Sequence, residues 1–280
     1  MDLGLTMFFT DRSMTPVALA RAAEERGFSS LWLPEHTHIP VSRATPAPMG
    51  EPLPEEYRRT LDPFVALATV AAVTDRLRLG TGICLVAQRD PVITAKEVAT
   101  LDHLSGGRFT FGIGFGWNVE ELGDHGVAFD DRRSVARERM LAMRRLWEQD
   151  EAAFTGEHVR LEPSWAWPKP VQRPHPPIFI GGAGGPSLFR HIAEYADGWL
   201  PIGGRGVRDA LPQLRQAAEE AGRDPDELRV TPFGTIPTPG KLEHYAGLGI
   251  TEVVLQLPSG TEAEVLPVID RHASFLEAMA

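Results

Sequence analysis

Short apolar segments alternate with longer amphipathic segments along most of the chain. In Val17–Arg26, alanines and Val17 recur on one side of a helix, while Arg21, Glu24 and Glu25 recur on the other side. The short segments have the length and composition of buried strands. The pattern predicts eight strands: Leu3–Met7, Ser30–Leu33, Leu77–Ile83, Arg108–Gly114, Ile178–Ile180, Gly198–Leu200, Leu228–Phe233 and Glu252–Leu257. Helices are predicted between them, among them Val17–Arg26, Phe64–Thr74, Val92–Leu104, Arg133–Glu148 and Val207–Ala221.

The ends of several predicted helices carry matching signals. Three helices begin with a capping oxygen followed by proline, which has no amide that needs a partner: Thr15-Pro16, Asp62-Pro63 and Asp90-Pro91. Glycines stand where helices are expected to stop in the left-handed conformation: Gly27, Gly106 and Gly222. These signals place the helix boundaries close to the predicted strands, with short turns between them.

Strands that alternate with helices through short turns are typical of parallel βαβ units. Eight such units in 280 residues predict one (β/α)8 barrel that occupies residues 1–280 as a single domain. A doubly wound parallel sheet is the competing architecture.

Two connections are longer than a barrel requires. The proline-rich segment Pro34–Thr60 follows the second strand, and it is either a surface excursion or a lid over the barrel mouth. Asp150–Pro177 is predicted to be an insertion between the fourth helix and the fifth strand, formed by a short hairpin and an extended segment.

Composition narrows the class of protein. The chain is 42% hydrophobic and 24% charged, which is ordinary for a globular protein, and its net charge of −10 makes nucleic acid an unfavourable partner. The single cysteine, Cys84, cannot form an internal disulfide, which fits a reducing compartment. The first residues lack the pattern of a signal peptide, and no apolar run is long enough to cross a membrane. We therefore expect a cytoplasmic protein without a membrane partner.

The catalytic site of a βα barrel lies at the carboxyl ends of its strands. Here those positions are apolar, aromatic and rich in glycine. The chain has three lysines, Lys96, Lys169 and Lys241, and all are predicted on helices or in the insertion, which disfavours Schiff-base chemistry. Acids and histidines follow the second strand only, so no metal site is expected. A flat organic cofactor that brings its own reactivity remains.

Three groups of residues are candidates for the chemistry. His36 suits proton transfer near neutral pH, and Glu35 either orients it or acts itself; the alternative is a histidine that only packs in its loop. The run Gly182–Gly185 before a helix suits a phosphate group, although it could also be a flexible turn. Trp117 is either a stacking wall or core.

Gly112, Gly114 and Gly116 do not form a dinucleotide fingerprint, because their spacing differs from that motif and no helix is expected directly behind them. We interpret them as allowing close approach of a planar ring to the backbone. Cys84, at a strand end, is interpreted as a small buried apolar residue.

Several segments together resemble the luciferase-like monooxygenase family, in particular its oxidoreductases that depend on the deazaflavin F420. The most specific stretch runs from Leu101-Asp102-His103-Leu104-Ser105-Gly106-Gly107-Arg108 into Gly112-Ile113-Gly114-Phe115-Gly116-Trp117-Asn118. Supporting matches are Leu31-Trp32-Leu33-Pro34-Glu35-His36, Arg78-Leu79-Gly80-Thr81-Gly82-Ile83, Arg89-Asp90-Pro91, Pro177-Ile178-Phe179-Ile180-Gly181-Gly182 and Asp197-Gly198-Trp199. The similarity covers roughly residues 1–255.

The resemblance implies a (β/α)8 barrel with its insertion between helix four and strand five. It implies that the cofactor ring lies against the end of strand three, with a non-proline cis peptide at Gly82-Ile83, and that His36 lies near the reactive carbon. The phosphate would lie on Gly182–Gly185. The implied cofactor-binding residues are Thr81, Gly82, Ile83, Gly114, Gly116, Trp117, Asn118, Gly182, Ala183, Gly184 and Gly185.

The leading hypothesis from the resemblance is hydride transfer between F420 and a small, partly apolar organic substrate. The alternative is an FMN-dependent monooxygenase that receives reduced flavin from a separate reductase. A third reading is a non-catalytic flavin-binding barrel. The composition, rich in Arg, Ala, Gly and Pro, is typical of bacterial genomes of high GC content, and the family resemblance implies a homodimer.

Overall fold

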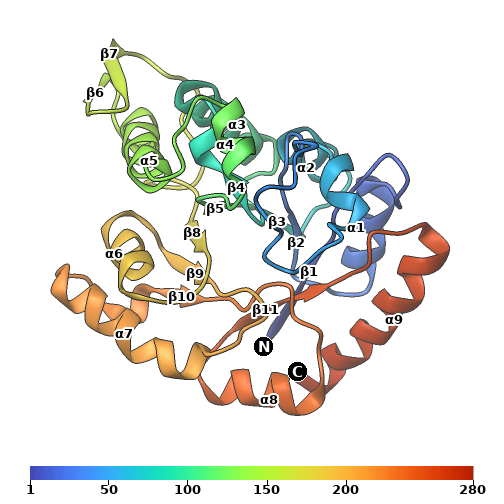
Figure 1. Ribbon diagram of the computed structural model, residues 1–280. Coiled ribbons are helices and arrows are strands. Elements are labelled where there is room, and N and C mark those ends of the chain that lie inside the picture. Colours follow the sequence, from blue (N-terminus) through green and yellow to red (C-terminus); the bar gives the residue numbers. More distant parts are fainter. Residues whose placement is uncertain (280) are drawn as a thin grey trace.

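Eight parallel strands form the barrel that the sequence predicts (Figure 1). The structure is a computed structural model that describes residues 1–279 and the side chains of residues 1–276. The barrel strands are β1 (Asp2–Thr6), β2 (Ser30–Leu33), β3 (Arg78–Thr81), β5 (Phe109–Gly114), β8 (Ile178–Gly181), β9 (Gly198–Leu200), β10 (Arg229–Val230) and β11 (Glu252–Gln256). They pair in the order β10-β9-β8-β5-β3-β2-β1-β11.

The barrel closes between β11 and the segment that follows β10. The Thr235 amide donates to the Val254 carbonyl at 2.9 Å, and the Gln256 amide donates to the Thr235 carbonyl at 3.0 Å. All four residues of β2 are buried, as expected where both faces of a parallel sheet are covered. The mostly parallel sheet is thus a nearly closed (β/α)8 barrel, and the doubly wound alternative is not what the chain forms.

The predicted third strand is interrupted. β3 ends at Thr81, the Gly82-Ile83 peptide bond is cis, and a separate short strand, β4 (Cys84–Leu85), pairs with the end of β5. The cis bond expected at this position is therefore present. Cys84 is fully buried, as predicted, and burial raises the pKa of its thiol.

Helices surround the barrel (Figure 1). They are α1 (Pro16–Glu25), α2 (Pro63–Ala71), α3 (Pro91–Leu104), α4 (Val119–Asp124), α5 (Arg132–Glu148), α6 (Pro186–Tyr195), α7 (Val207–Glu220), α8 (Pro239–Gly247) and α9 (Glu262–Met279), with the 3-10 turns η1 (Glu55–Arg59), η2 (Val86–Gln88) and η3 (Pro225–Glu227). Thr15, Asp62 and Asp90 accept hydrogen bonds from first-turn amides, which confirms the predicted caps. The predicted glycine stops have positive φ: Gly27, Gly106 and Gly222.

One expectation about helices is wrong. No helix was expected directly behind Gly116, yet α4 begins at Val119. Asn118 makes this possible because its side-chain oxygen accepts a hydrogen bond from the Glu121 amide at 3.0 Å and caps the helix.

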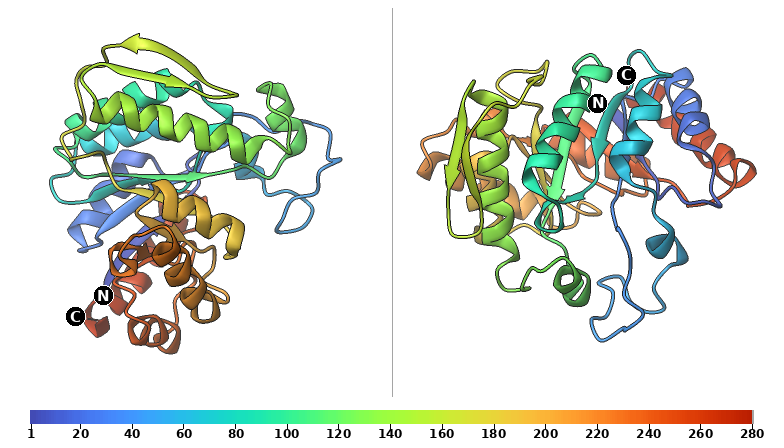
Figure 2. Two further views of the ribbon diagram at one scale, coloured as in Figure 1. Left: turned by 90° about the vertical axis from the view of Figure 1, so that its left-hand side faces the viewer. Right: turned by 90° about the horizontal axis from the view of Figure 1, so that it is seen from above.

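The insertion has the predicted form of a hairpin and an extended segment. The hairpin pairs β6 (Ala152–Thr155) with β7 (Arg160–Ser164) in antiparallel fashion. Lys96 on α3 donates to the Trp167 carbonyl, and Lys169 donates to the Leu146 carbonyl at 2.8 Å, so both lysines hold the insertion and neither lies at the barrel mouth. The outer part of the long loop after β2, drawn in blue, projects beyond the barrel in both views of Figure 2.

No helix within residues 1–279 is both long enough and apolar enough to span a membrane.

Candidate active site

A cavity of about 570 Å³ lies at the carboxyl ends of the strands. Every barrel strand contributes to its wall, either by its last residues or by the residues that follow it, and the loop after β2 contributes Pro48, Met49 and Tyr57. We call this space the mouth cavity and the loop Pro34–Thr60 the lid loop. Its volume is in the range of cavities that bind organic cofactors and substrates.

His36 lies in the wall of the mouth cavity and is held by a buried carboxylate. Its Nδ1 lies 2.9 Å from Oε1 and 3.1 Å from Oε2 of Glu121. The Glu121 side chain is fully buried and the His36 side chain is 7% exposed, so the pair is shielded from water. Because Nδ1 must carry the proton to donate to a carboxylate, Nε2 is left as the free nitrogen, and it forms no hydrogen bond with any residue of the described chain.

Two aromatic side chains flank His36. The Tyr57 ring centroid is 5.2 Å from that of His36, and the Trp117 ring meets His36 edge-on at 5.9 Å. Both aromatic residues line the mouth cavity. Burial, with a smaller effect from Glu56, raises the pKa of Tyr57 to about 12, so its hydroxyl stays protonated and can donate a hydrogen bond into the cavity. Trp117 is therefore a wall of the cavity.

Glu35 does not contact His36 through its carboxylate. One oxygen accepts from the Leu85 amide at 2.7 Å and the other accepts from Nε of Arg89 at 2.6 Å. Arg89 also pairs with Asp62 at 2.5 Å and with Glu97 at 3.0 Å. The carboxylate that orients His36 is Glu121, and Glu35 anchors the start of the lid loop to the barrel.

Ile83 forms part of the cavity floor, and glycines on the two neighbouring strands leave room for it. A Cβ at Gly114 would lie 2.5 Å from Cδ1 of Ile83, and a Cβ at Gly181 would lie 2.7 Å from its Cγ2. A Cβ at Gly112 would overlap the Thr81 carbonyl oxygen. Packing within the chain is thus sufficient to require glycine at these positions, and the interpretation of Gly112 and Gly114 as a surface for a planar ring stays a prediction.

Gly116 has a different requirement, because its φ of +78° lies in the left-handed region. It lets the backbone turn between β5 and α4, so that Trp117 enters the cavity wall and Asn118 caps α4.

The loop between β8 and α6, residues Gly182–Gly185, has the features of an anion site, and we call it the anion loop. Gly182 and Ala183 line the mouth cavity, and the Gly182 carbonyl accepts from Nε1 of Trp199 at 2.9 Å, which fixes the loop. The amides of Ala183, Gly184 and Gly185 donate to no other residue of the described chain. They lie just before the amino end of α6, whose partial charge is positive.

Two arginines from α5 add positive charge to the mouth cavity. Arg132 and Arg133 both line it. Arg133 donates to the Ser187 hydroxyl at 3.2 Å and stacks on the Phe115 ring at 4.7 Å, which places its guanidinium beside the start of α6. Backbone amides with adjacent guanidinium groups are the donors that a phosphate accepts.

The structure brings most of the predicted site residues together. His36, Glu35 and seven of the predicted cofactor-binding residues line the mouth cavity: Gly82, Ile83, Gly114, Gly116, Trp117, Gly182 and Ala183. Thr81 and Asn118 lie behind the wall, where Thr81 donates to the Gly112 carbonyl and Asn118 caps α4. Gly184 and Gly185 continue the anion loop beyond the cavity wall.

Four residues of the site are not predicted from the sequence: Glu121, Tyr57, Arg132 and Arg133. Only Glu121 had a local signal, because asparagine followed three residues later by glutamate is the spacing of a capped helix start. Within the described residues, no group of three or more His, Cys, Asp or Glu side chains lies together as metal ligands would.

Residues 14–238 match the luciferase-like monooxygenase family, and the chain belongs to that family. An uncharacterised protein of Mycobacterium tuberculosis is 45% identical over 280 residues, which covers 99% of each chain. The F420-dependent hydroxymycolic acid dehydrogenase of Mycobacterium tuberculosis is 30% identical over 226 residues, 79% of this chain and 57% of that protein. The crystal structure of the monooxygenase RslO1 from Streptomyces bottropensis superposes with a TM-score of 0.80 at 22% identity and covers all of both chains.

Proposed function

We propose that the protein is an F420-dependent oxidoreductase that interconverts an alcohol and a carbonyl group on a partly apolar organic substrate. The observation that carries this proposal is the buried His36–Glu121 pair in the wall of a mostly apolar cavity that is also lined by the glycine-rich loop between β8 and α6. The family consists of oxidoreductases and monooxygenases, and the related hydroxymycolic acid dehydrogenase is named for oxidation of an alcohol with F420.

The donor set of the site fits the proposed cofactor. The free amides of Ala183, Gly184 and Gly185, with Arg132 and Arg133, would hold its phosphate and further anionic groups. Ile83, kept in place between Gly114 and Gly181, would support the ring. When bound, F420 would accept a hydride from the substrate carbon or return one to it.

His36 supplies the proton transfer that must accompany hydride transfer. In the oxidation, Nε2 accepts the hydroxyl proton of the alcohol while the carbon–oxygen double bond forms, and in the reduction it returns that proton to the oxygen. Glu121 fixes the ring through Nδ1 and stabilises the imidazolium that forms. The protonated Tyr57 hydroxyl donates a hydrogen bond to the same substrate oxygen, and the lid loop limits access of water.

An FMN-dependent monooxygenase is the second candidate. The structure of RslO1 supports this candidate, because a protein with the same barrel fold is named a monooxygenase. An anion loop and an apolar floor serve FMN as well as F420, so the two candidates differ in the cofactor and in the use of oxygen.

Formation of a homodimer and a cytoplasmic location stay predictions.

Titration of the purified protein with F420 and with FMN tests the proposal. We expect tighter binding of F420, followed by fluorescence, and turnover of secondary alcohols that changes the F420 absorbance. A tenfold preference for FMN, with oxygen consumption when reduced FMN is added, would refute the proposal in favour of the monooxygenase.

A matched pair of variants tests the anion loop. A Cβ at Gly185 meets no atom within 4 Å, whereas a Cβ at Gly184 would lie 3.0 Å from the Trp199 ring, so Gly185 is the better position. Gly185→Asp places a carboxylate in the loop, and Gly185→Asn is its neutral counterpart of the same shape. Two negative charges about 5 Å apart repel each other by about 3 kcal/mol at an effective dielectric constant near 20, before solvent screening. We expect F420 affinity at least about tenfold lower for Asp than for Asn. Equal affinities would remove the loop from the site.

A further inference from the structure

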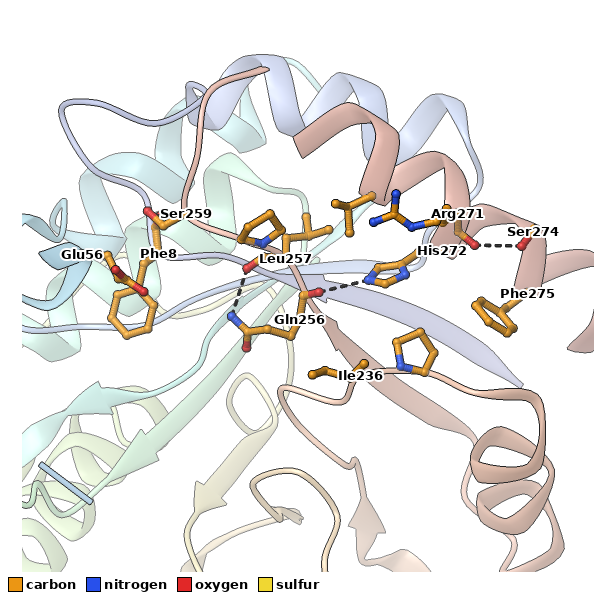
Figure 3. A pocket seen from close by; sticks show the side chains of 13 residues that line it. Phe8, Glu56, Ile236, Gln256, Leu257, Ser259, Arg271, His272, Ser274 and Phe275 are labelled. Atoms are coloured by element: carbon orange, nitrogen blue, oxygen red, sulfur yellow. Dashed lines mark hydrogen bonds between the residues drawn. The ribbon is translucent and has the colours of Figure 1, made fainter. Parts of the chain in front are cut away.

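A second hollow of about 650 Å³ lies beside the barrel mouth (Figure 3). Its walls come from α9, from the loop after β11, from Ile236 and Pro237 after β10, and from Glu56 in the lid loop. We call it the side pocket. Its volume is sufficient for a substrate-sized ligand.

The side pocket adjoins the mouth cavity. Phe8 and Gln256 line both spaces, so the two spaces meet at these two side chains. Phe8 packs on Tyr57 with ring centroids 4.6 Å apart, and Tyr57 in turn packs on His36. A continuous row of rings therefore leads from Phe8, where the two spaces meet, to the residue that we propose handles the proton.

The walls of the side pocket are predominantly apolar, and some of that surface is exposed to water. Val268 and Phe275 on α9 line the pocket together with Leu257, and Ile236, which also lines it, is 71% exposed. Covering exposed apolar surface with an apolar ligand is favourable, because it removes that surface from water.

One cation without a partner stands at the α9 side of the pocket. The Arg271 guanidinium forms no ion pair or hydrogen bond with any other described residue, whereas its neighbour His272 donates from Nε2 to the Gln256 carbonyl at 3.0 Å. Burial, with a smaller effect from Arg271, lowers the pKa of His272, so the imidazole is neutral near pH 7. Figure 3 shows Glu56 beside Phe8 and Arg271 on the side of α9, so opposite charges mark the two ends of the pocket.

We propose that the side pocket binds the apolar chain of the substrate and that Arg271 binds a carboxylate at the end of that chain, while the reacting alcohol or carbonyl lies in the mouth cavity. The Glu56 carboxylate disfavours the reverse orientation, because it repels an anion at the end next to the mouth. The substrate class is then an alkyl chain that carries a secondary alcohol or ketone and ends in a carboxylate. This assignment rests on the proposed function.

Binding of dodecanoate to the purified full-length chain without cofactor, measured by calorimetry, tests the pocket directly. Dodecanol and dodecylammonium are the neutral and cationic comparisons. We expect Arg271→Gln to weaken dodecanoate binding about fivefold, which is the contribution of a largely exposed ion pair, and to leave dodecanol binding within twofold. Arg145→Gln is the matched control, because Arg145 is an exposed arginine on α5 outside both cavities.

A second variant fills the pocket without touching the core. Ser274 is exposed and lines the side pocket, so Ser274→Trp should fold and should weaken both dodecanoate and dodecanol at least tenfold. The proposal is overturned if dodecanoate does not bind, if Arg271→Gln and Arg145→Gln give the same affinity, or if Ser274→Trp leaves the affinity unchanged.

A kinetic measurement separates failure of this inference from failure of the proposed function. With F420, kcat/KM for 11-hydroxydodecanoate is compared with kcat/KM for 2-butanol. We expect Arg271→Gln to lower the ratio of the two values about fivefold. A ratio equal to that of Arg145→Gln overturns the substrate assignment and keeps the oxidoreductase. Dodecanoate binding without turnover of any alcohol rejects the proposed function and retains the side pocket as an acyl-chain site.

Discussion

Replacement of Glu121 by glutamine is the sharpest test of the proton-transfer residues. The glutamine side chain has the same shape, and its carbonyl oxygen can still accept a hydrogen bond from Nδ1 of His36. What Glu121→Gln removes is the negative charge beside a ring that must become positive during the reaction. Because the Glu121 side chain is fully buried and that of His36 is 7% exposed, water cannot replace the lost charge.

The size of the effect follows from the two hydrogen bonds that are compared. A hydrogen bond to a charged group contributes about 1.5–3 kcal/mol, and a neutral one about 0.5–1.5 kcal/mol. The difference of about 1–2 kcal/mol corresponds to a loss in kcat of about 5- to 30-fold. The affinity for F420 should not change, because Glu121 touches His36 and the α4 cap and not the anion loop.

The assay is the change in F420 absorbance with a secondary alcohol, accompanied by an F420 titration and a thermal unfolding curve for each variant. A double-mutant cycle with His36→Asn separates positioning from general damage. If Glu121 acts through His36, Glu121→Gln has no further effect once His36 is replaced. An unchanged kcat in Glu121→Gln, or an equal loss with and without His36, would refute the reasoning.

Three further changes test the packing and the charges around the site. Gly114→Ala should cost about 1–3 kcal/mol in urea unfolding, because its Cβ would lie 2.5 Å from Cδ1 and 2.9 Å from Cγ1 of Ile83. Ile83→Val removes Cδ1 and keeps Cγ1, so it should recover part of the loss. The same cost in both backgrounds contradicts the contact. Arg89→Met removes the guanidinium that pairs with the Glu35 carboxylate, whose side chain is 2% exposed, and should cost about 3–5 kcal/mol in the same assay. A cost below about 1 kcal/mol argues against Glu35 as the anchor of the lid loop. Burial lowers the pKa of His272 in the folded chain, so the unfolded chain binds more protons below about pH 6.5 and the free energy of unfolding falls as the pH drops. His272→Gln should flatten this pH dependence when unfolding is measured at several pH values. Superimposable curves for the two proteins would contradict the prediction.

The barrel could be predicted from the sequence because its signals are local. Each strand is a short apolar segment, and the caps at Thr15, Asp62 and Asp90 fix helix starts within a few residues of their own positions. The strand ends then follow from the barrel topology, which is why His36, Gly82 and Ile83 could be placed at the mouth in advance.

The partners of the site residues could not be predicted in the same way. Tyr57 reaches His36 only because the lid loop folds back over the mouth, and Arg133 reaches the start of α6 from a helix more than fifty residues earlier in the chain. Such contacts depend on the tertiary structure and leave no periodic pattern. Glu121 was missed because α4 has six residues, too few for a helical period to be visible.

The glycines within β5 show the opposite difficulty. Glycine indicates close approach of some atom but does not say which one. Here atoms of the chain itself already account for the close approach, namely the Thr81 carbonyl oxygen at Gly112 and the Ile83 side chain at Gly114. Glycine in a cavity wall can thus predict close packing without identifying the atom that packs there.

Arg89 has a consequence for how this protein could diversify. Its guanidinium binds Glu35, just after the lid loop begins, and Asp62, just after it ends, so one side chain fixes both ends of the segment. Extra residues between fixed ends add only a slowly growing entropy cost, about 0.6 kcal/mol for each doubling of loop length. The stretch between these two carboxylates can therefore be exchanged for one of another length or sequence while the barrel stays intact. Grafting of lids from related chains at these two positions offers a practical route to new substrate preferences.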